Sequence, residues 1–106
     1  MFSISPHIFL YNNPMDMRNG FEGLSFVIEK SFSEKLTSGA FFVFLNKKRD
    51  RMKILYWDND GLAIWYKRLE KGRFQKSQKI QLNRKEFLML LEGITPKKID
   101  KRYNIF

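Results

Sequence analysis

Apolar residues recur along this chain with two different periods, one typical of helices and one typical of strands. Residues 7–11 (HIFLY) are a short apolar run that ends at an Asn-Asn-Pro sequence, which favours a strand followed by a turn. From residue 17 onward, apolar positions return every three or four residues, which predicts a helix. Its apolar face consists of Met17, Phe21, Leu24, Val27 and Ile28.

The start of this helix is predicted from polar residues and glycines. Asp16 is the expected N-cap, because its carboxylate can accept hydrogen bonds from the exposed amides of the first turn. Gly20 and Gly23 each weaken the helix by about 1 kcal/mol relative to alanine. Two glycines spaced three residues apart on a helix also let another backbone come close, so this pair marks a candidate packing contact.

The middle of the chain is predicted to form several strands. Residues 40–46 are a continuous apolar run, as in a buried strand, and residues 51–57 and 62–69 alternate with a period of two. Residues 58–61 (DNDG) predict a tight hairpin turn, because Asn, Asp and Gly tolerate the positive φ that such turns require. With a weak candidate strand at residues 79–82, the pattern indicates a meander of three strands, extended to four or five by the outer candidates.

A second helix is predicted after the strands. Residues 83–86 (NRKE) match a capping box, in which Asn accepts at the N-cap and Glu reaches back to the Asn amide. The predicted fold class is α+β, with a small antiparallel β-meander sheet of three to five strands packed with an N-terminal and a C-terminal helix. Residues 1–94 are expected to be a single domain, and residues 95–106 a basic C-terminal tail that could be flexible.

Composition narrows the class of protein. The chain has 106 residues, enough for one ordinary domain, and its 11 Phe, 4 Tyr and 2 Trp can supply an aromatic-rich core. It contains no cysteine, which excludes disulfides, thiolate metal sites and cysteine nucleophiles. Its longest apolar run, residues 40–45, is too short to span a bilayer, and the N-terminus lacks the pattern of a signal peptide. A cytoplasmic location without membrane contact is therefore expected.

Positive charge is concentrated in one part of the sequence. The formal net charge is +9, and residues 47–79 hold eleven basic and four acidic residues, whereas residues 1–46 hold three basic and four acidic ones. The segment after residue 93 adds four basic residues against one acidic residue. Such a distribution suits a surface that meets a polyanion, and the alternative is that the surplus lysines serve solubility.

Candidate catalytic groups are few. His7 is the sole histidine, and Asp58 and Asp60 resemble the start of a calcium loop, but apolar residues stand where later oxygen ligands are needed. A metal-dependent nuclease would need converging carboxylates, for which Asp16, Asp58, Asp60 and Glu70 are the candidates, and most of these lie at predicted turns. The sequence therefore predicts no enzyme, no cofactor and no metal site.

The basic and aromatic residues of the strands are the strongest functional signal. Arg51, Lys53 and Trp57 are alternate residues of one predicted strand and should point to the same face, as should Trp65 and Lys67 on the neighbouring strand. If both sets face solvent, they form a surface that can bind phosphates and unpaired bases. The alternative is that both tryptophans belong to the core, with lysines at its rim. The candidate nucleic-acid contacts are Arg18, Arg49, Arg51, Lys53, Lys67, Arg68 and Arg73.

Several stretches also match a known family. Residues 16–24 (DMRNGFEGL), 39–44 (GAFFVF), 51–74 (including YWDNDG and WYKRLEKGRF) and 90–93 (LLEG) resemble the TnpB-type second-frame protein of insertion-sequence 66 elements. The resemblance covers about residues 7 to 94. It implies an accessory role in transposition, beside a separate and larger transposase that carries the catalytic acids.

Two functions remain open from the sequence. The first is binding of element DNA through the basic segment, and the second is a protein-binding adaptor that assembles with the element-encoded transposase without contacting DNA. Element DNA and the transposase are thus the expected partners, and a homo-oligomer is compatible with either function. A nuclease-like enzyme is the third class, and we expect no such activity.

Overall fold

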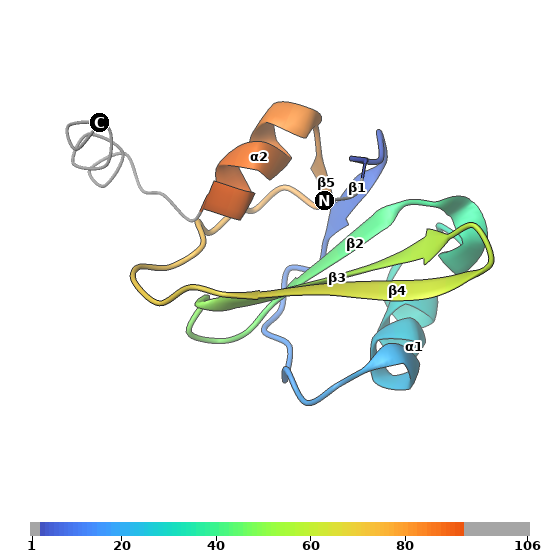
Figure 1. Cartoon of the computed structure of the whole chain (residues 1–106), viewed down its shortest axis with the longest axis horizontal. Helices are drawn as coiled ribbons and strands as arrows, with labels where there is room; N and C mark the ends of the chain where they lie inside the picture. Colours follow the sequence, from blue (N-terminus) through green and yellow to red (C-terminus); the bar gives the residue numbers. More distant parts are fainter. Residues whose placement is uncertain (1–2, 93–106) are drawn as a thin grey trace.

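The computed structural model describes residues 3–92, in which five strands form one mixed sheet that carries a helix on each face (Figure 1). The strands pair in the order β4-β3-β2-β1-β5. In chain order the elements are β1 (Ile8–Leu10), α1 (Phe21–Ser31), the 3-10 turn η1 (Leu36–Ser38), β2 (Phe41–Leu45), β3 (Arg51–Asp58), β4 (Gly61–Arg68), β5 (Gln81–Leu82) and α2 (Arg84–Glu92).

The first strand gives the sheet its mixed character. β1 pairs in parallel with β2, with Ile8 opposite Phe41, whereas the β2–β3, β3–β4 and β1–β5 pairs are antiparallel. The parallel pair arises because α1 returns the chain to the end of the sheet where β1 began, so that β2 runs the same way. The predicted α+β class with two helices is confirmed, but the expectation of an all-antiparallel sheet is wrong at β1.

Alternating residues divide the core into two layers, one on each side of the sheet. α1 covers one layer and α2 the other, with Phe87 of α2 fully buried in the second. All five residues of β2 are buried, since both of its faces are covered, which explains its unbroken apolar sequence. The α1 layer contains Met15, Leu24, Ile28, Ala40, Phe42, Phe44 and Leu55. The α2 layer contains Ile8, Leu10, Phe41, Val43, Leu45, Met52, Ile54, Phe74, Leu82, Phe87, Leu90 and Leu91.

The two helices begin differently from each other. At α2 the capping box is present: the Glu86 amide donates to Asn83 Oδ1 at 2.8 Å, and the Asn83 amide donates to Glu86 Oε1 at 2.9 Å. The hydrogen bond from the Asn83 amide, with a second one from Lys79, lowers the pKa of Glu86. At α1 the N-cap is Gly20, and the prediction that Asp16 caps this helix is wrong.

The remaining predictions about the chain concern its ends and its membrane contacts. The basic tail at residues 95–106 lies outside the described residues, so its flexibility stays a prediction. Neither helix within residues 3–92 is long and apolar enough to cross a membrane.

Candidate nucleic-acid interface

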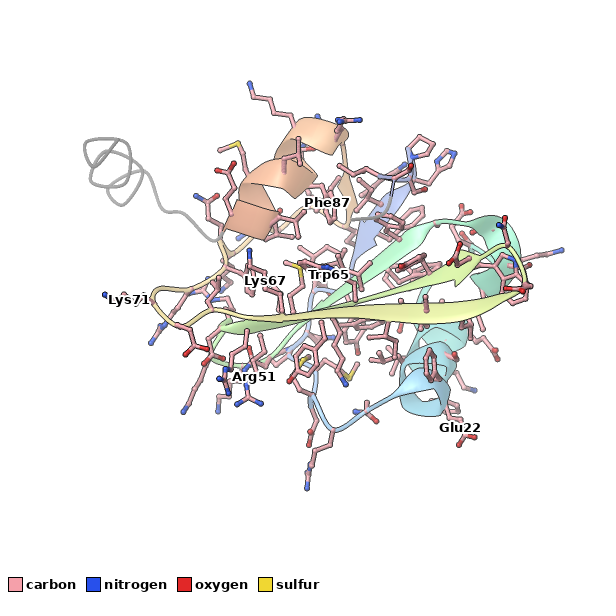
Figure 2. All side chains as sticks on the ribbon, in the orientation of Figure 1. Glu22, Arg51, Trp65, Lys67, Lys71 and Phe87 are labelled. Atoms are coloured by element: carbon pink, nitrogen blue, oxygen red, sulfur yellow. The ribbon has the colours of Figure 1, made fainter. Side chains whose placement is uncertain are left out.

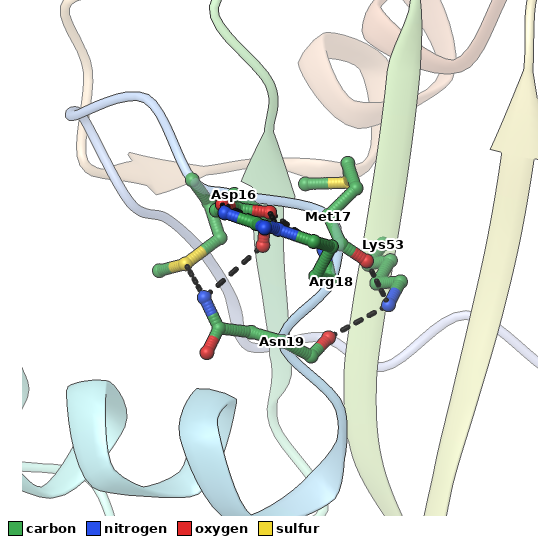
Figure 3. A network of polar contacts seen from close by, with 6 residues as sticks. Asp16, Met17, Arg18, Asn19 and Lys53 are labelled. Atoms are coloured by element: carbon green, nitrogen blue, oxygen red, sulfur yellow. Dashed lines mark hydrogen bonds and ion pairs between the residues drawn. The ribbon is translucent and has the colours of Figure 1, made fainter.

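The loop before α1 is held onto the sheet by one buried lysine. Lys53, on β3, is 8% exposed, and its Nζ donates to the carbonyl oxygens of Met17 and Asn19, each at 2.7 Å (Figure 3). The same Nζ lies 4.9 Å from the centre of the Tyr66 ring on the neighbouring strand, a cation–π distance. The ammonium charge is thus compensated by carbonyl oxygens and a ring face, and Lys53 fixes the path of residues 16–20.

The two glycines near the start of α1 do not receive another backbone. A Cβ at Gly23 would collide with the Asn19 side chain, whose Cγ would be 2.9 Å away, whereas nothing lies within 4 Å of a Cβ at Gly20. Asn19 in turn donates from Nδ2 to the Asp16 carbonyl at 3.1 Å. Gly23 therefore makes room for a side chain that closes the 16–20 loop, which differs from the expected backbone contact.

Asp16 serves this loop as a side-chain acceptor. Its Oδ1 accepts from the Arg18 amide at 2.8 Å, and its Oδ2 accepts from Arg18 Nη2 at 2.6 Å. These bonds explain why Asp16 does not cap α1, because its carboxylate is used within two residues. The Arg18 side chain is 92% exposed, so the loop presents a guanidinium at the surface.

We expect the Asp16–Arg18 pair to be visible in an acid titration. The hydrogen bonds from Arg18 lower the pKa of Asp16 from the ordinary 3.8 to about 2. Because the folded-state pKa is lowered, the stabilisation is complete above pH 3.8 and is lost as the pH falls through about 2. Carboxyl carbon NMR should show this titration, and Arg18→Ala should raise the pKa only part of the way, since the backbone amide still donates. An unchanged pKa in Arg18→Ala would contradict this assignment.

Two basic loops meet at the end of the sheet near this pair. The β2–β3 turn and the long connection from β4 to β5 lie together at the left of Figure 1. Backbone hydrogen bonds join them, from the Leu69 amide to the Asp50 carbonyl and from the Phe74 amide to the Arg49 carbonyl, both 2.7 Å long. Asn46 orders the turn by accepting from the Asp50 and Arg51 amides through its Oδ1. The contact gathers residues that are far apart in the sequence.

We name this surface the basic end. Its members share a place on the two joined loops or at the adjacent strand ends, and all have exposed or half-exposed side chains. The acidic residues of the same segments are Asp50, which accepts from Asn46 Nδ2 at 2.6 Å, and Glu70, which pairs with Arg68 at 3.0 Å. The basic end consists of Lys47, Lys48, Arg49, Arg51, Arg68, Lys71, Arg73 and Lys76.

An open depression of about 600 Å³ connects the basic end to the Arg18 loop. Its lining includes Asp16 and Arg18 from the loop before α1, and Lys47, Lys48, Asp50 and Arg51 from the β2–β3 turn and the start of β3. Tyr66 also lines it, and its hydroxyl accepts a long hydrogen bond of 3.4 Å from Arg51 Nη1. The depression is thus lined by cationic side chains from two separate segments, which suits a bound chain of phosphates.

The opposite end of the molecule is acidic. Asp58 and Asp60 flank the exposed β3–β4 turn, where Asn59 has a φ of 56°, as the DNDG sequence predicts. Figure 2 shows Arg51 and Lys71 toward one end and Glu22, on α1, toward the other. The basic segment of the sequence therefore lies at one end of the folded domain, and these acidic residues lie toward the other end.

Comparison with known proteins identifies the family. The family model described as "IS66 Orf2 like protein" matches residues 6–101. The chain belongs to this IS66 Orf2-like family. Membership implies an accessory role in transposition.

Two relatives of this IS66 Orf2-like chain are named as uncharacterized proteins. The protein y4jC of Sinorhizobium fredii is 31% identical over 91 residues, covering 82% of this chain and 78% of the relative. The protein y4hO of the same organism is 32% identical over 59 residues, covering 56% of this chain and 51% of the relative. No solved structure matches this chain.

In this family member the two sets of basic and aromatic strand residues lie on opposite faces of the sheet. Lys53 is paired with Tyr66 and Met52 with Lys67, so Lys53 faces α1 and Lys67 faces α2. Lys67 Nζ donates to the Leu91 carbonyl near the end of α2 at 3.2 Å. The two sets therefore form no common surface, and Trp65 packs against the α2 layer.

The other sequence-predicted contacts fall into one region. Arg49, Arg51, Arg68 and Arg73 belong to the basic end, and Arg18 lines the same depression as Arg51. Lys53 is not available at the surface, and Lys67 is turned to α2. Four members of the basic end are not among the contacts predicted from the sequence: Lys47, Lys48, Lys71 and Lys76. Lys76 lines a neighbouring hollow with Lys47 and Arg49, and no local pattern shows that the long connection lies beside the turn.

No metal centre is evident in the part of the chain that the structure describes. Within residues 3–92, no three side chains of His, Asp or Glu come together in a group that could hold an ion. His7 is exposed near the start of β1, and Asp58 and Asp60 belong to the tight turn at the acidic end.

Proposed function

We propose that this IS66 Orf2-like protein is a non-catalytic accessory factor that binds element DNA through the basic end. The observation that carries the proposal is the joining of two basic loops by the backbone bonds between residues 49 and 74 and between residues 50 and 69. This contact concentrates eight cationic side chains at one end of a small domain. Duplex DNA carries phosphates at close intervals along both strands, and such a surface can neutralise several of them at once.

The depression gives this surface an orientation. Arg18 and Arg51 both line it and come from different segments, so a phosphate backbone lying along the depression would be contacted by both segments. The Asp16 carboxylate holds the Arg18 guanidinium in place while leaving the side chain exposed. Contacts of this kind fix register and orientation on the nucleic acid and carry no sequence information themselves.

A second candidate function is a protein-binding adaptor for the transposase. The specific observation is a pair of exposed rings on α1, Phe21 at 49% and Phe26 at 62% exposure. Exposed aromatic side chains are enriched at protein–protein interfaces. This function would leave DNA binding to the transposase.

The test of DNA binding is fluorescence anisotropy with labelled element-end DNA and a scrambled DNA, across a salt series. We expect the double variant Lys47→Ala/Lys48→Ala to weaken binding by about tenfold and to reduce the salt slope by roughly 1 to 2. The matched control is Lys30→Ala/Lys35→Ala, which removes the same charge from exposed positions away from the basic end. The control should bind nearly as well as the unmodified protein.

Other outcomes would contradict the proposal or change it. An equal loss of DNA affinity in both double variants would show that binding depends on net charge and not on the basic end. An absence of binding at low salt would favour the adaptor function, which co-purification with the transposase and the Phe21→Ala/Phe26→Ala variant can then test. Tighter binding to the element end than to the scrambled DNA would assign sequence recognition to this protein.

DNA incubated with the protein and Mg²⁺ should stay uncut, and nicking abolished by Asp58→Ala would contradict a non-catalytic role.

A further inference from the structure

The two edges of the sheet are very different. β5 forms one edge and has two residues, whereas β4 forms the other and has eight. Residues 61–66 (GLAIWY) of β4 carry no charge and no proline, and every residue of this stretch is at least partly exposed. Natural proteins protect edge strands by shortness, charge or proline, and the first six residues of β4 have none of these. β4 is therefore a surface on which another strand can pair.

The hydrogen-bond pattern shows which residues of β4 face outward. The β3–β4 register places Asp58 opposite Gly61, and the Leu69 amide donates to the Asp50 carbonyl, so the odd-numbered residues exchange bonds with β3. The N–H and C=O groups of Leu62, Ile64 and Tyr66 consequently point away from β3. Among residues 3–92, β3 is the only strand that pairs with β4.

The charges at the two ends of β4 are opposite in sign. Asp60 precedes the strand in an exposed turn, and Arg68 ends it with an exposed guanidinium. A strand running antiparallel, with Ile64 opposite its own copy, would pair Leu62 with Tyr66 and Asp60 with Arg68. The same pairs recur on both sides of the two-fold axis, as an isologous interface requires. The edge is therefore complementary to itself.

We propose that two copies of this chain pair through their β4 strands, antiparallel and centred on Ile64, to form a continuous ten-stranded sheet. The pairing satisfies the outward backbone groups of both edges. Arg68 is free to exchange partners, because its bond to Glu70 joins two exposed side chains and such pairs contribute little. The dimer places the two basic ends far apart, each beside the acidic turn of the other copy. The proposal of a dimer depends only on β4 and would hold whether or not the basic end binds DNA.

The test is sedimentation velocity of the full chain without DNA, over a range of protein concentrations, together with amide hydrogen exchange. We expect a concentration-dependent dimer in which the amides of Leu62, Ile64 and Tyr66 become protected as dimer forms. A chain that stays monomeric up to millimolar concentration would overturn the proposal. A dimer whose three edge amides exchange as fast as in the monomer would overturn it as well.

Charge variants locate the interface. Asp60→Lys should raise the dimer dissociation constant by roughly tenfold, because two opposed pairs change from attraction to repulsion. Adding Arg68→Glu to that variant should restore the dimer, since the pair is re-formed with its signs exchanged. Glu22→Lys makes the same charge change outside β4, in the first turn of α1, and should leave the constant nearly unchanged. A dimer equally sensitive to Asp60→Lys and Glu22→Lys would contradict the β4 interface.

Discussion

Replacing Lys53 with methionine should lower the free energy of unfolding by about 2 to 3 kcal/mol. Methionine keeps much of the apolar stem but loses the ammonium that bonds the carbonyls of Met17 and Asn19. Each charge-assisted bond of this kind contributes roughly 1.5 to 3 kcal/mol, and the variant is also spared the cost of burying an ammonium. The expected loss is therefore smaller than the sum of the two bonds.

Urea unfolding followed by circular dichroism measures this loss, and Lys67→Met is the matched control. Lys67 is half-exposed, and its Nζ donates to the Leu91 carbonyl at 3.2 Å, a longer bond than either bond of Lys53, so the control should lose less stability than Lys53→Met. The Lys53 variant should also loosen the Arg18 loop and bring the pKa of Asp16 closer to its ordinary value. Equal losses in the two variants would show that Lys53 does not act as the tether of this loop.

The Phe42→Ala variant should be the most destabilised of all, losing about 3 to 5 kcal/mol. The Phe42 side chain is fully buried at the centre of the α1 layer. Its ring centre lies 5.9 Å from that of Phe9 and 5.4 Å from that of Phe32, so the substitution leaves a cavity bordered by two other rings. Since a domain of this size is stabilised by only about 5 to 15 kcal/mol, the variant would have little stability left.

The same substitution at an exposed ring gives the control. Phe26 on α1 is 62% exposed, so Phe26→Ala should change stability by less than about 0.5 kcal/mol. Thermal unfolding of the two variants in parallel measures the difference. A similar loss in both would mean that Phe42 is not central to the α1 layer.

The parts of the fold that were predictable depend on short-range signals. The run at residues 40–46, the DNDG turn and the capping box each involve neighbouring residues, and each corresponds to a feature of the structure. In all three cases the local sequence and the tertiary structure favour the same conformation. The sequence therefore predicted β2, β3, β4 and α2 close to their observed places.

The parts that were not predictable depend on distant or competing contacts. β1 is parallel to β2 because of the path of α1, which strand patterns do not encode. The Asp16 carboxylate could either cap α1 or accept hydrogen bonds from Arg18, and in the structure it accepts from Arg18. The alternation of β3 correctly placed Arg51 and Lys53 on one face. It could not show that the 16–20 loop covers Lys53 and leaves Arg51 at the surface, since that depends on residues more than 30 positions away.

The candidate interface shows the same division. Basic residues of the β2–β3 turn and of the β4–β5 connection were recognisable as two separate groups. Their union depends on the bonds of Asp50 and Arg49 to residues 69 and 74, which are long-range backbone contacts. A sequence pattern can thus indicate that a surface is cationic before it can show which cations share that surface.

The position of β1 between β2 and β5 also affects how the protein folds during synthesis. During synthesis β1 leaves the ribosome before the other described elements, and one of its two neighbours, β5, is among the last of these elements to follow. Until β5 and α2 have emerged, Ile8, Phe41 and the other α2-layer residues of the sheet are exposed to solvent. β1 is then an unpaired edge strand, as β4 is. A nascent chain that already has α1 and the β2–β3–β4 meander therefore still exposes an apolar face of the sheet. This side of the sheet is expected to stay exposed until α2 has been synthesised.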